Sequence, residues 1–120
     1  MSWTQSFAHA GRGFADAVRA ERNLRVHVVA MIAIISLAAW LGLPAREWVP
    51  LVLCFGLVIS LELVNTAIER LADRVCAEHD ELIRQAKDVA AAAVLVAALM
   101  SVAVGVLVLG HPLAERLAGL

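Results

Sequence analysis

Three long apolar stretches, separated by short polar segments, dominate the pattern of hydrophobic and polar positions along the chain. They cover residues 26–43, 48–68 and 89–109, and Glu62 is the only Asp, Glu, Lys or Arg within them. The shortest has 18 residues, which is about 27 Å of helix and just enough to cross a hydrocarbon core of roughly 30 Å. The pattern therefore predicts an all-α membrane protein with three transmembrane helices.

The segment before the first span, residues 2–22, predicts an amphipathic helix. Its apolar positions recur at helical spacing on one side, and they are Trp3, Phe7, Phe14 and Val18. Such a helix either lies in the membrane interface or caps the helix bundle as a soluble helix, and the pattern leaves both alternatives open.

The connection between the second and third spans, residues 69–88, is polar. Helix is expected to continue from the second span to about Cys76 and to begin again near Asp80 or Glu81. Beyond the third span, Gly110 and Pro112 are expected to end the helix, so that the last eight residues form a short tail.

A stripe of small residues follows one face of the third span. Its members stand four positions apart, and they are Ala93, Ala97, Ser101 and Gly105. Small side chains let neighbouring helices approach closely in a membrane, so we expect this face to pack against protein.

Composition adds limits to this picture. The chain has 120 residues, 62% of them hydrophobic, with a mean hydropathy of +0.81, which indicates one compact membrane unit. A net charge of −1 gives no support for a nucleic-acid partner. Three helices of this length bury little surface alone, so a homo-oligomer is expected. Cys54 lies in a span and Cys76 in a polar connection, so no disulfide is predicted.

Basic residues predict the orientation in the membrane. Most of them lie in the N-terminal segment and in the second connection, namely Arg12, Arg19, Arg22, Arg25, Arg70, Arg74, Arg84 and Lys87. Because cytoplasmic loops carry an excess of Lys and Arg, the N-terminus and this connection are expected in the cytoplasm and the C-terminus outside.

The polar end of the second span carries the strongest hint of chemistry. Glu62, Asn65, Glu69 and Asp73 are spaced 3, 4 and 4 apart, which puts them on one face of a helix. A carboxylate at the edge of a membrane helix costs roughly 2–4 kcal/mol and usually faces a bundle interior or a polar cavity. One alternative is a helix end that has left the membrane, with Glu62 snorkelling, but the polar stripe favours a site.

Polar groups at the ends of the three spans lie at one membrane level, and they are expected to converge if the helices form a bundle. Glu21 precedes the first span, Glu62 and Glu69 end the second, and Lys87 and Asp88 begin the third. Mg²⁺ prefers one or two carboxylates plus substrate phosphates, which suits Glu21 and Glu69. Glu62, the deepest carboxylate, suits a general base for a lipid hydroxyl, and Lys87 suits a phosphate.

Blander interpretations remain open beside this one. The charged residues of the second connection could instead form surface ion pairs that only determine the orientation in the membrane. Asp73 would then be a helix cap or a salt-bridge partner of Arg70 or Arg74. Cys76-x-x-His79 supplies two metal-ligand types, fewer than the three or four protein ligands of a typical zinc site. His27 and His111 are expected at the membrane interface. The chain contains no nucleotide-binding G-x-x-x-x-G-K-[ST] loop and no protein-kinase motif set.

Two linked motifs resemble a known family. They are Glu62-x-x-Asn65-Thr66-Ala67-Ile68-Glu69-x-x-x-Asp73 and, downstream, Ala86-Lys87-Asp88-Val89, with Phe7-x-x-Ala10-x-x-Gly13 and Glu21-Arg22-Asn23-Leu24-Arg25-Val26-His27 upstream. Together they are similar to the bacterial integral-membrane diacylglycerol kinase and undecaprenol kinase family, over nearly the whole chain from Phe7 to Val108.

The resemblance implies a multi-pass protein of the bacterial inner membrane, with three spans and an N-terminal surface helix. It implies a homotrimer with sites shared between subunits and no nucleic-acid partner. The implied activity is that of an ATP-dependent lipid phosphotransferase, which transfers the γ-phosphate of MgATP to diacylglycerol or undecaprenol. Phosphoryl transfer needs mainly alignment and charge neutralisation, so a small site suffices.

The resemblance also implies residue roles. Glu62 matches the catalytic base and Asn65 an essential polar residue beside it, while Glu21 and Glu69 match the metal-binding carboxylates. The implied nucleotide-binding positions are His9, Glu21, Glu69, Glu78, Asp80, Lys87 and Asp88. The chain departs from the family at two of these, since His9 stands where an aromatic residue is common and Asp80 where many members have His.

The sequence leaves open which lipid is the substrate and whether the protein is an enzyme at all. The segment from Glu21 to His27 resembles the undecaprenol kinase branch more closely, because the Ala-Ala-Phe-Arg-Gln-Glu run typical of the diacylglycerol branch is absent. This favours undecaprenol slightly, with diacylglycerol close behind. Two other functions remain open: a non-catalytic membrane subunit whose polar stripe joins helices, and an ion or proton pathway through Glu62.

Overall fold

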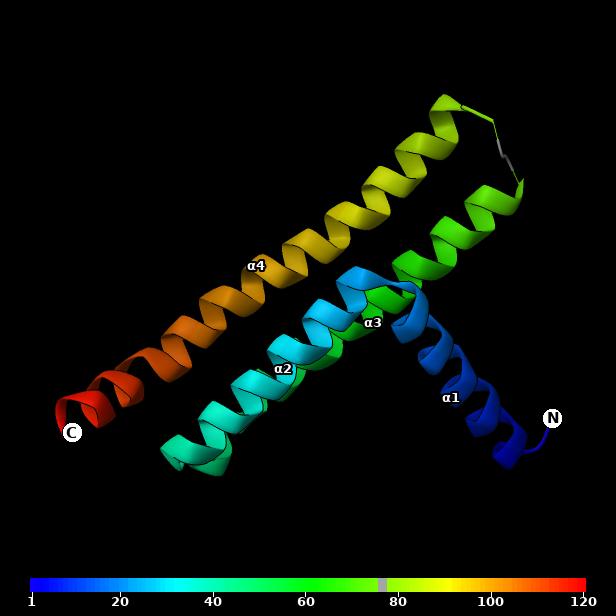
Figure 1. Cartoon of the computed structure of the whole chain (residues 1–120). Helices are drawn as coiled ribbons and strands as arrows, with labels where there is room; N and C mark the ends of the chain where they lie inside the picture. The colour runs from blue at the N-terminus through cyan, green and yellow to red at the C-terminus, as the bar shows by residue number, and fades with distance from the viewer. Residues whose placement is uncertain (76–77) are drawn as a thin grey trace.

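The computed structural model describes residues 1–75 and 78–120, and four helices make up most of that part of the chain. They are α1 (Trp3–Ala20), α2 (Arg22–Leu41), α3 (Ala45–Val75) and α4 (Glu81–Ala118). The last three are each long and apolar enough to cross a membrane. They run side by side, while α1 leaves the bundle at a steep angle (Figure 1). The predicted all-α fold, with three spans and an N-terminal helix, is confirmed.

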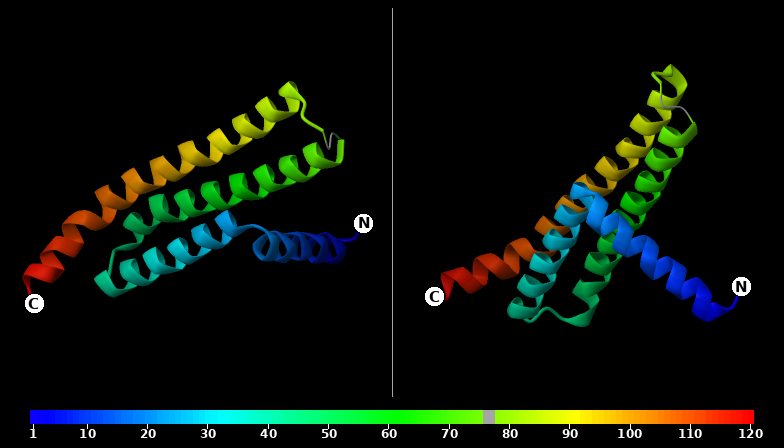
Figure 2. Two further views of the ribbon diagram at one scale, coloured as in Figure 1. Left: turned by 45° about the horizontal axis from the view of Figure 1, so that its top comes forward. Right: turned by 45° about the vertical axis from the view of Figure 1, so that its right-hand side comes forward.

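The hairpin of α3 and α4 is longer than a bilayer is thick. With 31 and 38 residues, the two helices extend about 46 and 57 Å, against a hydrocarbon core of roughly 30 Å. Their connected ends project beyond the start of α2, as all three views show (Figures 1 and 2). The last turns of α3 and the first turns of α4, which are the charged ones, therefore stand outside the apolar layer.

A tight turn joins α2 to α3 at the opposite end. Gly42 ends α2 with a positive φ of 67°, and the Gly42 and Leu43 amides donate to the Ala39 and Ala38 carbonyls at 3.1 and 3.4 Å. This paired arrangement satisfies the last carbonyls of a helix and requires a left-handed residue. Beside the turn, Ala38 forms a small buried core with Leu51 and Leu109. All three spans are packed together at this end of the bundle.

A single extended residue, Glu21, separates α1 from α2. It has φ −106° and ψ 112°, so it ends one helix and begins the next. The Arg25 guanidinium donates back to the carbonyls of Val18 and Arg19, at 3.0 and 2.7 Å. A cation on the last carbonyls of a helix stabilises that end. The direction in which α1 leaves the bundle is thus fixed by a short junction and a side-chain clamp.

The aromatic side of α1 faces outward. Trp3 and Phe7 are 84% and 73% exposed, and Phe14 is also exposed. α1 contacts α2 and α3, and Ala17, near its C-terminal end, is its buried residue. An exposed aromatic face on a helix that leaves the spans at an angle fits the interfacial alternative of the two that the sequence left open.

The start of α4 agrees with the sequence prediction, and Cys76, the predicted end of the preceding helix, lies outside the described residues. α3 is described to Val75, and α4 begins at Glu81. The side chain of Asp80 caps α4 by accepting from the amides of Leu82 and Ile83, at 2.9 and 3.1 Å. A carboxylate that satisfies the first free amides is a strong helix start.

The predicted end of the third helix at Gly110 and Pro112, with a short tail after it, is wrong. α4 continues through Gly110 and Pro112 to Ala118, because a proline removes one backbone hydrogen bond and bends a helix without necessarily ending it. The bend is visible near the C-terminal end of α4 (Figure 2). The last turns gain support from Arg116, whose guanidinium lies 4.6 Å from the Trp40 ring centroid.

The small-residue stripe of α4 packs against protein only in part. Ala97 is buried, whereas Ala93 is exposed. A Cβ built at Gly105 would meet no atom within 4 Å, so no described helix approaches closely there. Ser101 and Gly105 instead line an open space between the spans.

Candidate active site

Glu62 is the one acidic residue that is buried within the part of the chain that the structure describes. Its side chain is 5% exposed, and its Oε1 lies 3.1 Å from Nε2 of His27. The hydrogen bond joins α3 to α2, and it gives a buried carboxylate the partner that burial demands. Burial against α2 contradicts the alternative in which Glu62 snorkels out of the bundle.

Two more carboxylates lie near Glu62. Glu21, at the junction of α1 and α2, and Glu69, two turns further along α3, are both close enough to act on Glu62 electrostatically. At the N-cap of α2, Glu21 makes no side-chain capping hydrogen bond with the described helix. Three negative groups therefore converge from two parts of the fold, which is an arrangement that favours a cation.

Asn65 adds an oxygen beside this group. Its side-chain Oδ1 is buried and has no hydrogen-bond partner among the described residues. Buried polar atoms are nearly always paired, so an unpaired amide oxygen is available to a ligand. Thr66, one turn after Glu62, is also buried.

A second polar pair bridges α3 and α4. The Lys87 ammonium donates to Oδ1 of Asp73 at 2.8 Å. The predicted partners of Asp73 were Arg70 or Arg74, and this prediction is wrong, because the hairpin brings α4 within reach. The hydrogen bond to Asp73 raises the pKa of Lys87, and Glu69 adds to the effect through its charge. Lys87 thus connects the second pair with the carboxylates around Glu62.

Other predicted nucleotide-binding residues lie outside this cluster. Asp88 pairs with Arg84 on the surface of α4, and Asp80 is occupied as the cap of that helix. Glu78 is exposed in the connection and takes part in an interaction of its own. His9 is exposed on α1, where it contacts Arg12.

The described residues contain no group of three or more His, Cys, Asp or Glu that is able to hold a metal on its own. Mg²⁺ bound to a nucleotide does not require one, since phosphate oxygens complete its shell. The carboxylates of Glu21 and Glu69, with the unpaired oxygen of Asn65 nearby, are the hard oxygen donors that this ion prefers. Cys76, of the predicted Cys76-x-x-His79 pair, lies outside the described residues.

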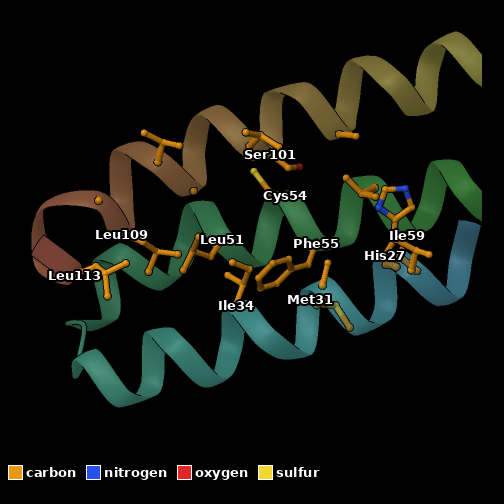
Figure 3. A pocket seen from close by; sticks show the side chains of 18 residues that line it. His27, Met31, Ile34, Leu51, Cys54, Phe55, Ile59, Ser101, Leu109 and Leu113 are labelled. Atoms are coloured by element: carbon orange, nitrogen blue, oxygen red, sulfur yellow. The ribbon is translucent and has the colours of Figure 1, made fainter. Parts of the chain in front are cut away.

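An apolar groove of about 640 Å³ runs between the spans. It is lined by α2, α3 and α4, and its size falls in the range of small-molecule sites. His27 stands at one end, while Leu109 and Leu113 stand at the other, with Met31, Ile34 and Phe55 between (Figure 3). The groove therefore begins at the ring that contacts Glu62 and continues along the length of the bundle.

His27 is a site residue that sequence reasoning missed. It was expected at the membrane interface, yet its ring turns toward α3. One signal existed, since a lone His in an uncharged span needs a polar partner. Thr66 carried a weaker signal, because it stands four positions after Glu62 and so on the same helical face.

Comparison with known proteins identifies the relatives of this chain. The profile of the family described as prokaryotic diacylglycerol kinase matches residues 8–109. An undecaprenol kinase of Bacillus subtilis is 41% identical over 104 residues, covering 87% of this chain and 85% of that protein. A diacylglycerol kinase of Synechocystis is 41% identical over 109 residues, 90% of this chain and 62% of that protein. A diacylglycerol kinase of Escherichia coli is 35% identical over 94 residues, 78% and 77% of the two chains.

Proposed function

This chain belongs to the prokaryotic diacylglycerol kinase family, and from that premise we propose that it is a membrane lipid kinase with Glu62 as its catalytic base. The transfer proposed is that of the γ-phosphate of MgATP to the hydroxyl of a lipid. One observation carries the proposal: a buried carboxylate accepts a hydrogen bond from His27, and the His27 ring lines one end of an apolar groove between the membrane spans.

In the proposed step the phosphoryl group passes directly from ATP to the lipid oxygen. Glu62 accepts the proton of the lipid hydroxyl, and the oxygen forms a bond to the γ-phosphorus of ATP. The bond from that phosphorus to the bridging oxygen breaks, and ADP leaves with the electron pair. Such a reaction depends mainly on alignment and on neutralised charge. Lys87, at the polar end of the bundle, supplies a positive charge for phosphate oxygens.

Magnesium belongs to the proposal as the partner of ATP. When bound, the ion would neutralise phosphate charge, held by the carboxylates of Glu21 and Glu69. Asn65, beside the base, is proposed to orient the reacting groups through its unpaired oxygen. The remaining proposed nucleotide contacts are those of His9, Glu78, Asp80 and Asp88. In the structure each of these side chains interacts with a group of the protein itself, so each would have to exchange that partner for the nucleotide.

The lipid proposed is undecaprenol, with diacylglycerol as the second candidate. The Bacillus subtilis relative bears the name undecaprenol kinase, while other relatives bear the name diacylglycerol kinase. The groove supports a hydrocarbon chain of either kind, because its lining residues come from apolar stretches of all three spans.

Orientation and assembly are proposed from charge and from the family resemblance. The N-terminus and the α3–α4 connection are assigned to the cytoplasm, where ATP is available. A homotrimer with shared sites is proposed, and large exposed apolar side chains on the spans, such as Leu53 at 67%, leave surface for such contacts.

The first experiment measures transfer from labelled ATP with Mg²⁺ by purified protein in mixed micelles, with undecaprenol and diacylglycerol offered in parallel. We expect phosphorylation of at least one lipid, and the ratio of rates names the substrate. Glu62→Gln should reduce transfer by at least about 100-fold, because an amide accepts no proton. A folded, oligomeric wild-type protein that phosphorylates neither lipid would contradict the proposal.

A second experiment tests the magnesium ligands. Removing either carboxylate, by Glu21→Ala or Glu69→Ala, should raise the Mg²⁺ concentration for half-maximal rate by about 10- to 100-fold. Glu115→Ala, at the far end of α4, is the matched control and should behave as wild type. If both site variants keep the wild-type Mg²⁺ dependence, the ligand assignment is wrong.

A non-catalytic helix-joining subunit is the second candidate, and the His27–Glu62 hydrogen bond between α2 and α3 favours it. The two candidates differ in one outcome. Under the subunit hypothesis, Glu62→Gln disrupts assembly, measured by size exclusion in detergent. Under the kinase hypothesis, it leaves assembly intact and removes transfer.

A further inference from the structure

We propose that His27 is a positioning residue for Glu62, holding the carboxylate in the orientation from which it accepts the lipid hydroxyl proton. The inference rests on the proposed function and adds to it a residue on a different helix. It also assigns a role to a polar contact that joins α2 to α3 at the end of the groove lined by His27.

The geometry of the pair defines the bond. Nε2 of His27 lies 3.1 Å from Oε1 of Glu62, and the two side chains are 27% and 5% exposed. An ionised carboxylate only accepts hydrogen bonds, so the hydrogen lies on Nε2. With Oε1 engaged in this way, Oε2 is the oxygen that takes the proton from a substrate.

Electrostatics explains why the carboxylate needs to be held. Glu21 and Glu69 are the other acidic groups that act on Glu62, and like charges repel a carboxylate away from them. A glutamate side chain has several rotatable bonds, and fixing them costs conformational entropy. The hydrogen bond from His27 opposes both effects and keeps one orientation.

The location of the ring links this role to the lipid. His27 lines the end of the groove as well as contacting Glu62 (Figure 3). A lipid whose chain lies in the groove therefore has its polar end at this ring. Loss of the donor should lower kcat, whereas a purely steric role in the groove would change only the KM for lipid.

The kinetic test compares three substitutions in the full-length protein. His27→Leu removes the donor and should lower kcat by about 10- to 100-fold, with the KM for MgATP unchanged, because small misplacement of a catalytic group has effects of that size. His27→Gln carries its amide nitrogen about as far out as Nε2 and should recover most of the loss. His27→Asn is too short to reach and should not recover it.

The matched control is a second histidine that pairs with a glutamate, far from the candidate site. His111 lies 3.0 Å from Glu115 near the far end of α4, and both side chains are exposed. His111→Leu should keep wild-type kcat and both KM values. Helix content and oligomer size are measured for every variant, and the Gln and Asn pair decides the result if His27→Leu does not fold.

A second readout does not depend on activity. In protein labelled with ¹⁵N-histidine, the His27 signal is assigned by its absence in His27→Gln. Glu62→Gln should shift the Nε2 resonance of His27, because the bond to a charged acceptor is lost. The His9, His79 and His111 signals should stay in place.

Each outcome supports or overturns the inference. Wild-type kcat in folded His27→Leu, equal rates for the Gln and Asn variants, or an effect confined to the lipid KM would overturn it. An unshifted Nε2 resonance in Glu62→Gln would overturn it as well. A wild-type protein without kinase activity but with the expected shift would contradict the proposed function while leaving the pairing of the two residues established.

Discussion

At the scale of single residues, burial separates the candidate base from the candidate ligands. Glu62 is buried in the bundle, whereas Glu21 and Glu69 are half-buried and Asp73 is exposed. A group that takes a proton from a lipid hydroxyl has to stand at membrane depth, and groups that meet a nucleotide have to be reachable from water. The buried residue is thus the one proposed to meet the lipid, and the half-buried Glu21 and Glu69 are those proposed to meet MgATP.

Lys87 leads to a prediction about nucleotide affinity. Lys87→Met removes the cation proposed to bind phosphate and should raise the KM for MgATP by about 10- to 100-fold, with a smaller effect on the lipid KM. Lys87→Arg, which keeps the charge, should lose less. Steady-state kinetics with varied MgATP measure both, and an unchanged KM in the Met variant would exclude a phosphate contact.

The same residue predicts a pH dependence. Its pKa is raised above the ordinary value of 10.5 by the hydrogen bond to Asp73. A cation with a raised pKa is fully present below its ordinary pKa and is lost only as the pH rises beyond it. The contribution of Lys87 to MgATP affinity should therefore be constant from about pH 6 to about pH 9. Asp73→Asn should leave it constant, because an unpaired lysine is still charged in that range.

Sequence reasoning reached the polar stripe but not all of its partners. The spacing of Glu62, Asn65 and Glu69 is a property of one helix, so it follows from the sequence directly. The partner of Glu62, His27, lies 35 positions earlier, and only packing of two helices brings the pair together. The same holds for Asp73 and Lys87, which the α3–α4 hairpin joins.

At the scale of elements, hydropathy predicted the helices better than their ends. Apolar runs define where a helix crosses the membrane, but a helix continues into water for as long as its backbone hydrogen bonds persist. α4 continues past Pro112 for this reason, and the contact of Arg116 with Trp40 lies beyond the predicted limit. A proline in the sequence predicts the loss of one helical hydrogen bond. Whether the helix then ends or only bends depends on the contacts that the following residues make.

Gly42 gives a prediction for the turn between α2 and α3. Its φ of 67° is costly for a residue with a Cβ, so Gly42→Ala should destabilise the fold by about 1–2 kcal/mol. Gly110→Ala is the control, because Gly110 is helical and a Cβ there meets no atom within 4 Å. Unfolding in SDS, followed by helix content, measures both variants. Equal stability of the two would show that the turn does not require a left-handed residue.

At the scale of the whole molecule, the long hairpin and the short α2 divide the protein into two levels. All three spans pack together around Ala38 and Leu51 at one end, and only α3 and α4 continue at the other (Figure 1). Glu21 and the junction of α1 lie at the N-terminal end of α2. The candidate site therefore lies at the boundary between the region where three helices pack together and the region formed by α3 and α4 alone.

Orientation in the membrane gives the whole-molecule prediction. In a background with Cys54 and Cys76 replaced by Ala, Arg46→Cys and His79→Cys mark opposite ends of the bundle. With right-side-out membrane vesicles, a maleimide that does not cross membranes should label position 46 and should reach position 79 only after lysis. Both native side chains are exposed, at 84% and 81%. The reverse pattern would put the candidate site outside and contradict its access to ATP.

The one-residue junction at Glu21 fixes the rotational phase of α1 relative to α2. Each residue added to or removed from a helix turns what precedes it by about 100°. A single residue inserted between Glu21 and Arg22 and added to the first turn of α2 would rotate the aromatic face of Trp3 and Phe7, and the Glu21 carboxylate, by that angle relative to Glu62. The length of this junction is therefore as closely constrained as the residues themselves, and deletions here should be far less tolerated than deletions at the C-terminal end of α4.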